Sequence, residues 1–216
     1  MEQIVQLNSN AKLSEHLASP SEATLGHSNK LVGSHLSPHF TLGEMTKSSS
    51  HPEVYNIPSH EAIANLKMVC EWLEVLRKRY NERYVVNRRD PSTALGMTGG
   101  GTLGMTTSPV SSRLSEAHGE ISEKPIIINS GYRSPQLNKK IGGVAGSNHL
   151  TGCAVDIRVL GMEQLIRYAT ILLDYADESK QDFDELLIER NRYGAIWLHF
   201  AVRPFSNRRK VAFIRA

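Results

Sequence analysis

Apolar residues recur at three- and four-residue intervals between positions 63 and 80, which predicts a helix with one buried face. The residues of this face are Ile63, Leu66, Val69, Leu73, Leu76 and Tyr80. Ser59 precedes the pattern as a candidate N-cap, and Glu61 falls in the first turn, where the helix dipole favours an acidic side chain. A second long helix is predicted at about 162–178.

The second half of the chain also contains segments in which apolar residues alternate with other residues, a period typical of strands. One such strand covers 155–159, with Asp156 on its non-core face. Another covers 197–202, with His199 on the face opposite Leu198 and Phe200. Further strands are expected near 186–188 and 211–214, a buried β-run at 124–130, and a short helix from Ser134 to the glycines at 142–143. Together these elements predict an α+β domain with a central antiparallel sheet and a few flanking helices.

The chain divides into three kinds of segment. Residues 1–36 are polar and lack a sustained period, so we expect a loosely ordered N-terminal extension before a folded domain at 37–216. Residues 91–120 are rich in Gly and Thr and contain Leu-Gly-Met-Thr twice, which predicts a flexible insertion within that domain. A functional lid is the alternative interpretation of this insertion.

Composition narrows the function classes. Of the 216 residues, 40% are hydrophobic and 22% charged, which is ordinary for a globular protein. Two cysteines cannot form a disulfide framework. No secretory signal is visible near the N-terminus, and no segment is apolar enough to predict a membrane span. The net charge of +3 and the small basic run at 208–210 are too weak to predict nucleic-acid binding, although they would suit an anionic polymer such as a cell wall.

Two histidines and one aspartate form the most informative constellation. His149 and Asp156 lie on either side of a Thr-Gly turn, and His199 follows on a later strand. Two imidazoles and one carboxylate are the donor set of a catalytic zinc ion that keeps a position open for water. A single histidine is more often an ordinary loop or core residue, but the combined pattern favours a metal site. Cys153 has the opposite strand parity to Asp156, which excludes it as a ligand.

Residues 40–210 resemble the zinc D-alanyl-D-alanine carboxypeptidase family of peptidoglycan peptidases, in the form common in phages and bacteria. The matching runs follow the family order, at residues 40–44, 127–138, 142–143, 147–156, 187–189, 197–199 and 207–210. The resemblance implies a hedgehog/D-Ala-D-Ala-peptidase-like fold and one zinc ion held by His149, Asp156 and His199. It also implies hydrolysis of a peptide bond in the peptidoglycan stem, by a carboxypeptidase or a muropeptide endopeptidase.

The chain departs from the family at the general base. Many relatives carry an acid three residues before the last histidine ligand, where this chain has Ile196. Glu189 is the best replacement, because a hairpin around 191–194 would place it opposite Trp197 or His199 on the metal side. The alternative is that Glu189 is a surface carboxylate paired with a nearby arginine. If the base is lost, the chain is instead a non-hydrolytic, zinc-containing peptidoglycan-binding domain.

Two further residues are candidates for contact with the substrate. Arg133 resembles the substrate-side arginine of the family, whose planar guanidinium can bind a terminal carboxylate or stabilise the developing oxyanion. A structural role as partner of a carboxylate is the alternative for Arg133. Ser147 either hydrogen-bonds the substrate or shapes the turn that carries His149.

Overall fold

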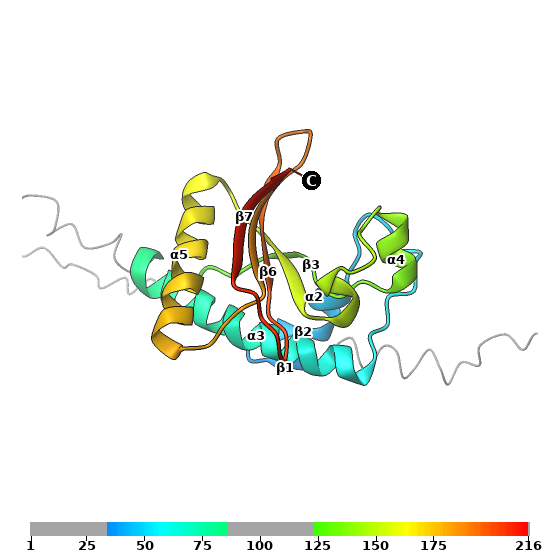
Figure 1. The fold of residues 1–216 in the computed structure, drawn as a ribbon, viewed down its shortest axis with the longest axis horizontal. Helices are drawn as coiled ribbons and strands as arrows, with labels where there is room; N and C mark the ends of the chain where they lie inside the picture. The colour runs from blue at the N-terminus through cyan, green and yellow to red at the C-terminus, as the bar shows by residue number, and fades with distance from the viewer. Residues whose placement is uncertain (1–33, 86–122, 216) are drawn as a thin grey trace, which may run out of the picture.

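The computed structural model describes residues 34–85 and 123–215. Apart from residues 34–36, the predicted N-terminal extension at 1–36 lies outside the described residues, and so does the predicted insertion at 91–120. In Figure 1 the central sheet stands between helix α5 (Met162–Ser179) on one side and helix α4 (Pro135–Lys140) on the other.

Five strands form the central sheet in the order β3-β4-β6-β5-β7. They are β3 (Ile128–Ser130), β4 (Ala154–Arg158), β6 (Ile196–Ala201), β5 (Glu185–Arg190) and β7 (Lys210–Arg215). Neighbouring strands are antiparallel except β5 and β7, which run parallel. Strand β6 has β4 on one side and β5 on the other, so the next strand, β7, pairs with the remaining free edge of β5. Because the chain reverses direction after β6, β7 runs parallel to β5. The predicted α+β class with a largely antiparallel sheet is confirmed.

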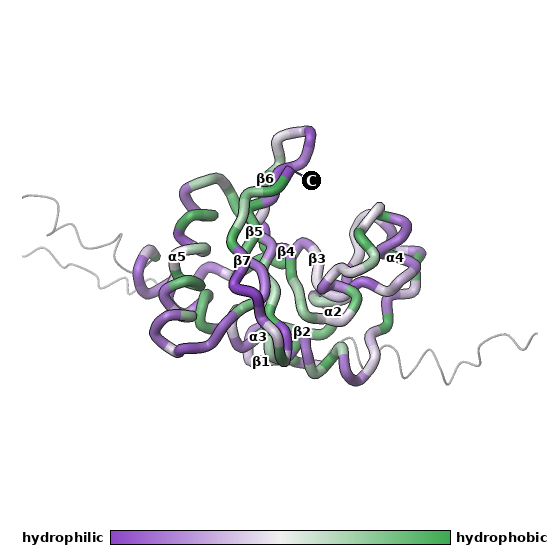
Figure 2. The backbone as a smooth tube through the Cα atoms, in the orientation of Figure 1, coloured by the Kyte–Doolittle hydropathy of each residue, from purple (hydrophilic) through white to green (hydrophobic). Residues whose placement is uncertain are grey.

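Two long helices, α3 (His60–Tyr80) and α5, contribute the buried side chains that pack with one face of the sheet. The strand residues in this core include Val155, Ile157, Leu198 and Phe200, which are the alternating positions that the sequence assigns to it. Figure 2 shows hydrophobic residues along the sheet and helices, whereas the turn between β5 and β6 is mostly hydrophilic. Neither long helix, nor any other helix in the described residues, is long and apolar enough to cross a membrane.

Helix α3 forms where the sequence predicts it. The hydroxyl oxygen of Ser59 accepts a hydrogen bond from the backbone N–H of Ala62 at 3.1 Å and so caps the first turn. The predicted apolar face is buried: Leu66, Val69, Leu73 and Leu76 have no exposed surface, Tyr80 is buried, and Ile63 is partly buried.

The short elements lie around this core. They are β1 (His35–Ser37), β2 (Phe40–Thr41), α2 (Leu42–Thr46), the π-helical turn η1 (Asn81–Val85), α4 and the 3₁₀ turn η4 (Asn148–Thr151). Helix α4 begins as predicted, because Ser134 caps it and Pro135 occupies its first position. It ends before Gly142, which has a φ of +76°.

The predicted buried β-run at 124–130 is wrong over most of its length. Only Ile128–Ser130 forms a strand, and within the preceding segment Ile126 is buried while Ile127 is 42% exposed. Strand β3 lies at the edge of the sheet, and its partner β4 ends at Arg158, whose N–H donates to the carbonyl of Ile127. Among the residues that the structure describes, residues 124–126 therefore have no strand beside them with which to pair.

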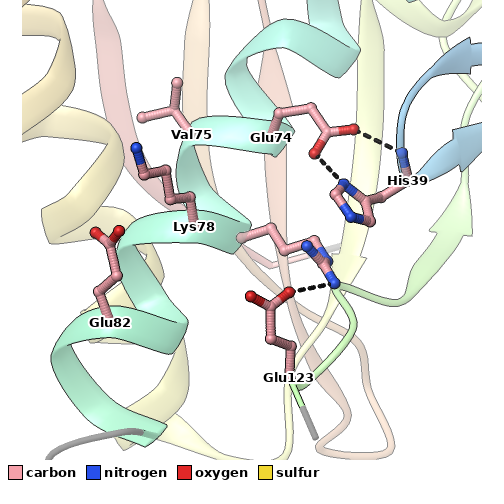
Figure 3. A pocket seen from close by; sticks show the side chains of 7 residues that line it. His39, Glu74, Val75, Lys78, Glu82 and Glu123 are labelled. Carbon is pink, nitrogen blue, oxygen red and sulfur yellow. Dashed lines mark hydrogen bonds and ion pairs between the residues drawn. The ribbon is translucent and has the colours of Figure 1, made fainter. Parts of the chain in front are cut away.

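A hollow of about 460 Å³ lies beside α3 (Figure 3). The carboxylate of Glu74 accepts hydrogen bonds from the backbone N–H of His39 at 2.8 Å and from the hydroxyl of Ser37 at 2.6 Å. It also pairs with His39 Nδ1 at 2.7 Å. Arg77 on the same helix pairs with Glu123 at 2.6 Å. These contacts fasten the β1–β2 turn and residue 123 to α3, which is a structural role.

Candidate metal centre

The register between β4 and β6 places Asp156 directly opposite His199. Residues opposite each other in an antiparallel pair have Cβ atoms about 5 Å apart, so their side chains meet on the same face. Val155 and Leu198, their neighbours in sequence, point into the core on the other face. The predicted strand alternation therefore brings a carboxylate and an imidazole together on the face opposite α3 and α5.

His149 reaches this face from η4. Ser147 caps the turn, and its hydroxyl oxygen accepts from the backbone N–H of His149 at 3.4 Å. Gly152 ends the turn in a left-handed conformation with φ of +74°, which glycine adopts without the strain of a side chain. Asn65 of α3 donates a 2.9 Å hydrogen bond to the carbonyl of Thr151 and so fixes the turn against the helix. The position of His149 is thus set by the same helix that supports the core.

The three side chains converge. Asp156 Oδ1 lies 2.9 Å from His199 Nδ1 and 3.3 Å from His149 Nε2, and the two imidazole nitrogens are 3.3 Å apart. Four tetrahedral ligands about 2.0–2.1 Å from a zinc ion are separated from one another by about 3.3 Å. The cluster of His149, Asp156 and His199 therefore has the donor atoms and the spacing to hold a metal ion.

Hydrogen bonding fixes which nitrogen of His149 faces the cluster. His149 Nδ1–H donates to the backbone carbonyl of Gly131 at 2.6 Å, which leaves the Nε2 lone pair toward Asp156. Burial lowers the pKa of His149, so its neutral form is favoured. A neutral imidazole with a backbone acceptor on its outer nitrogen is the usual state of a metal-binding histidine.

The electrostatics of the cluster favour the ionised form of Asp156. Burial alone would raise the pKa of this carboxyl, but the neighbouring His199, which pairs with Asp156 at 2.9 Å, holds it well below its usual range. Burial alone would lower the pKa of His199, whereas its contacts with Asp156 and then Glu185 raise it to about 9.

Arg133 lies against the cluster. Its guanidinium contacts the second oxygen of Asp156, and its Nε donates to the hydroxyl of Ser130 at 2.8 Å. Its backbone N–H donates to the carbonyl of His149 at 3.0 Å. Arg133 therefore has a carboxylate partner, as expected if its role is structural. It also lines the cleft beside the cluster, as expected if it contacts the substrate.

A cleft of about 760 Å³ opens over the three-residue cluster. Its walls include Arg133, Ser147 and Glu189, the other candidates from the sequence, so the structure brings all six predicted site residues to one cavity. Glu189 pairs with Trp197 in the β5–β6 register, and burial raises the pKa of its carboxyl. Within the described part of the chain, Glu189 forms no ion pair with the nearby arginines of the hairpin. Ile196 packs against the core and can transfer no proton.

Several polar residues that line this cleft or lie buried behind it do not follow from the sequence motifs. Glu185 lies 3.7 Å from His199 Nε2, and the fully buried Asp184 pairs with Arg203 and Arg208 at 3.0 and 2.7 Å. Asn148 donates to both acidic residues. The alternation that selects Glu189 as a cleft residue also selects Glu185, four positions earlier, so strand parity was a signal that could have identified it.

The comparisons with known proteins agree with this geometry. A family model described as peptidase M15 matches residues 105–172, which include His149 and Asp156 but not His199. A comparison with curated proteins finds no match. The matched family consists of metallopeptidases, and the His-Asp-His cluster in the chain can bind a metal ion. Residues 105–172 are therefore similar to the peptidase M15 family, of the zinc D-alanyl-D-alanine carboxypeptidase type, in agreement with the resemblance found in the sequence.

Proposed function

We propose that this protein is a zinc-dependent peptidase that hydrolyses a peptide bond in the peptidoglycan stem, as a D,D-carboxypeptidase or a muropeptide endopeptidase. The observation that carries the proposal is the convergence of His149 Nε2, Asp156 Oδ1 and His199 Nδ1 at 2.9–3.3 Å on the floor of a cleft. These three atoms would hold one zinc ion, because two nitrogens and one carboxylate oxygen at this spacing match three corners of its tetrahedron.

A zinc ion bound there would supply Lewis acidity, lowering the pKa of a water molecule from about 15.7 toward 7 and polarising the scissile carbonyl. Glu189 is the proposed general base: it accepts the proton of the attacking water and returns it to the leaving amine. The raised pKa of the partly buried Glu189 carboxyl suits this role, because a base works best when its pKa lies near the working pH.

Arg133 and Ser147 are proposed to act on the substrate side. The Arg133 guanidinium steadies Asp156 and presents positive charge to the cleft, where it can bind a substrate carboxylate or the developing oxyanion. Ser147 lines the same cleft and accepts from the N–H of His149, so its hydroxyl proton can be donated to a substrate carbonyl.

The basic run at 208–210 does not alter this proposal. Arg208 pairs with Asp184 and Glu185, Arg209 contacts Asp177, and Lys210 pairs with Glu185 at 3.1 Å. Phosphate-driven binding requires cations that can neutralise phosphates, and these three already have carboxylate partners. The charges therefore favour a peptide substrate over nucleic acid.

The test is mass analysis of purified peptidoglycan after digestion with the zinc-loaded full chain. We expect stem-peptide fragments that have gained one water, and none from His149→Ala. Glu189→Gln should keep its zinc but cleave about 10²- to 10⁴-fold more slowly, as expected for loss of a general base.

The control for this charge removal is Glu163→Gln on α5, where the glutamate is exposed and contacts Arg167. It should leave cleavage unchanged. Unimpaired cleavage by Glu189→Gln would exclude Glu189 as the base. A zinc-loaded wild type that binds sacculi and cleaves nothing would establish the non-hydrolytic binding domain instead.

A further inference from the structure

The imidazole of His199 has a partner on each nitrogen. Nδ1 faces Asp156 and His149, while Nε2 lies 3.7 Å from the carboxylate oxygen Oε2 of Glu185. We propose that Glu185 is a positioning residue of the metal centre, which holds His199 with its proton on Nε2 and its Nδ1 lone pair toward the metal. This inference rests on the proposed zinc site and adds a residue that neither the ligand motif nor the family match identifies.

The strand register brings Glu185 to His199. Glu185 pairs with Ala201 across β5 and β6, and His199 is two residues from Ala201 on the same face. Diagonal neighbours of this kind are within reach of a long side chain. Because Ala201 carries only a methyl group, the Glu185 side chain can extend over it toward the imidazole.

Other residues hold the Glu185 carboxylate in place. Asn148 Nδ2 donates to Oε2 at 3.1 Å, and Oε1 pairs with Arg208 at 3.0 Å and Lys210 at 3.1 Å. Oε2 is thus the Glu185 oxygen nearest His199, and it also accepts the hydrogen bond from Asn148, the residue directly before His149. Asn148 also donates to the buried Asp184 at 2.8 Å, so the turn carrying one ligand is tied to the strand that orients another.

The separation of 3.7 Å is an ion-pair distance, and a side-chain shift of less than an ångström closes it to a hydrogen bond of about 3.0 Å. Metal-binding histidines usually donate their outer N–H to a carboxylate, carbonyl or water, which fixes the ring and its tautomer. His149 has such a partner in the Gly131 carbonyl, and Glu185 gives His199 the equivalent.

The experiment measures the zinc affinity of the full chain by competition with a chromophoric chelator, together with its melting temperature. Glu185→Ala should weaken zinc binding by about 10- to 100-fold, the usual effect of losing an outer-shell partner. Glu185→Gln should restore part of this loss, because its amide oxygen still accepts from Nε2–H; it also serves as the folded variant if Glu185→Ala does not fold.

Lys210→Met is the matched control, since it removes a partner of Glu185 without touching His199. It should weaken zinc binding much less than Glu185→Ala, because Asn148 and Arg208 still hold the Glu185 carboxylate, even if it lowers the melting temperature. Wild-type zinc affinity in both Glu185 variants would overturn the inference while leaving the proposed function intact. So would a loss in Lys210→Met equal to that in Glu185→Ala, because Glu185 would then act by tethering β7. A wild type that binds no zinc would refute both proposals.

Discussion

Replacing Gly152 by Ala tests whether the turn that carries His149 depends on glycine. Gly152 has φ of +74°, and a Cβ added there would lie 2.4 Å from the carbonyl oxygen of Ala62 in α3. The left-handed conformation costs a residue with a side chain about 1–2 kcal/mol. Forcing the methyl group against the backbone of α3 costs about 1–3 kcal/mol more. The free energy of unfolding should therefore fall by about 2–5 kcal/mol.

The same clash should affect the metal centre, because the turn must move away from α3 and take His149 with it. We expect Gly152→Ala to lower the melting temperature by at least about 4 °C, taking about 2 °C per kcal/mol for a chain of this size, and to weaken zinc binding. Gly146→Ala is the control, since a Cβ at Gly146 meets no atom within 4 Å and its φ lies outside the left-handed region. If the two variants melt at the same temperature, the reasoning about the turn is wrong.

Three other predictions follow from the core and its charges. Leu66→Ala should lower the free energy of unfolding in urea by about 2–5 kcal/mol, because Leu66 is fully buried; a loss below about 1 kcal/mol would contradict this. Although burial raises the pKa of Asp184, its hydrogen bonds from Arg208 lower it below 3.8, so this carboxylate stabilises the fold above that value. The free energy of unfolding should therefore fall as the pH drops below about 4. In urea titrations between about pH 3 and pH 6, the free energy of unfolding should depend less on pH in Asp184→Asn than in the wild type. The same pH dependence in both proteins would contradict this prediction. Arg133→Met should weaken zinc binding by about 10- to 100-fold, measured by chelator competition, since it removes the partner of Asp156; unchanged affinity would show that the contact is dispensable.

Periodicity predicted the elements that carry the site. The three- and four-residue spacing from Leu66 to Leu76 marks the buried face of α3, and the two-residue alternation around Asp156 and His199 marks the strands that present both side chains to the cleft. These patterns are informative because each element has one buried face. The turn at Gly152 was predicted from the Thr-Gly pair, because glycine permits a tight turn, and Gly152 has a φ of +74°.

Features that depend on non-local pairing were not predictable in the same way. The apolar run at 124–130 resembles a buried strand, but whether a segment becomes a strand depends on a neighbour with which to pair, and β4 ends too early. The parallel pairing of β7 with β5 depends on which strand edge is open after β6 forms. The position of Glu185 was within reach of strand parity, but its contact with His199 depends on the exact register of β5 against β6.

The most direct test of the zinc site is a crystal structure of the zinc-loaded protein, with anomalous diffraction recorded at the zinc absorption edge. We predict one zinc peak about 2.0–2.2 Å from each of His149 Nε2, Asp156 Oδ1 and His199 Nδ1, with a further coordination position facing the cleft. A zinc ion bound elsewhere, or one that lacks any of these three ligands, would contradict the central claim.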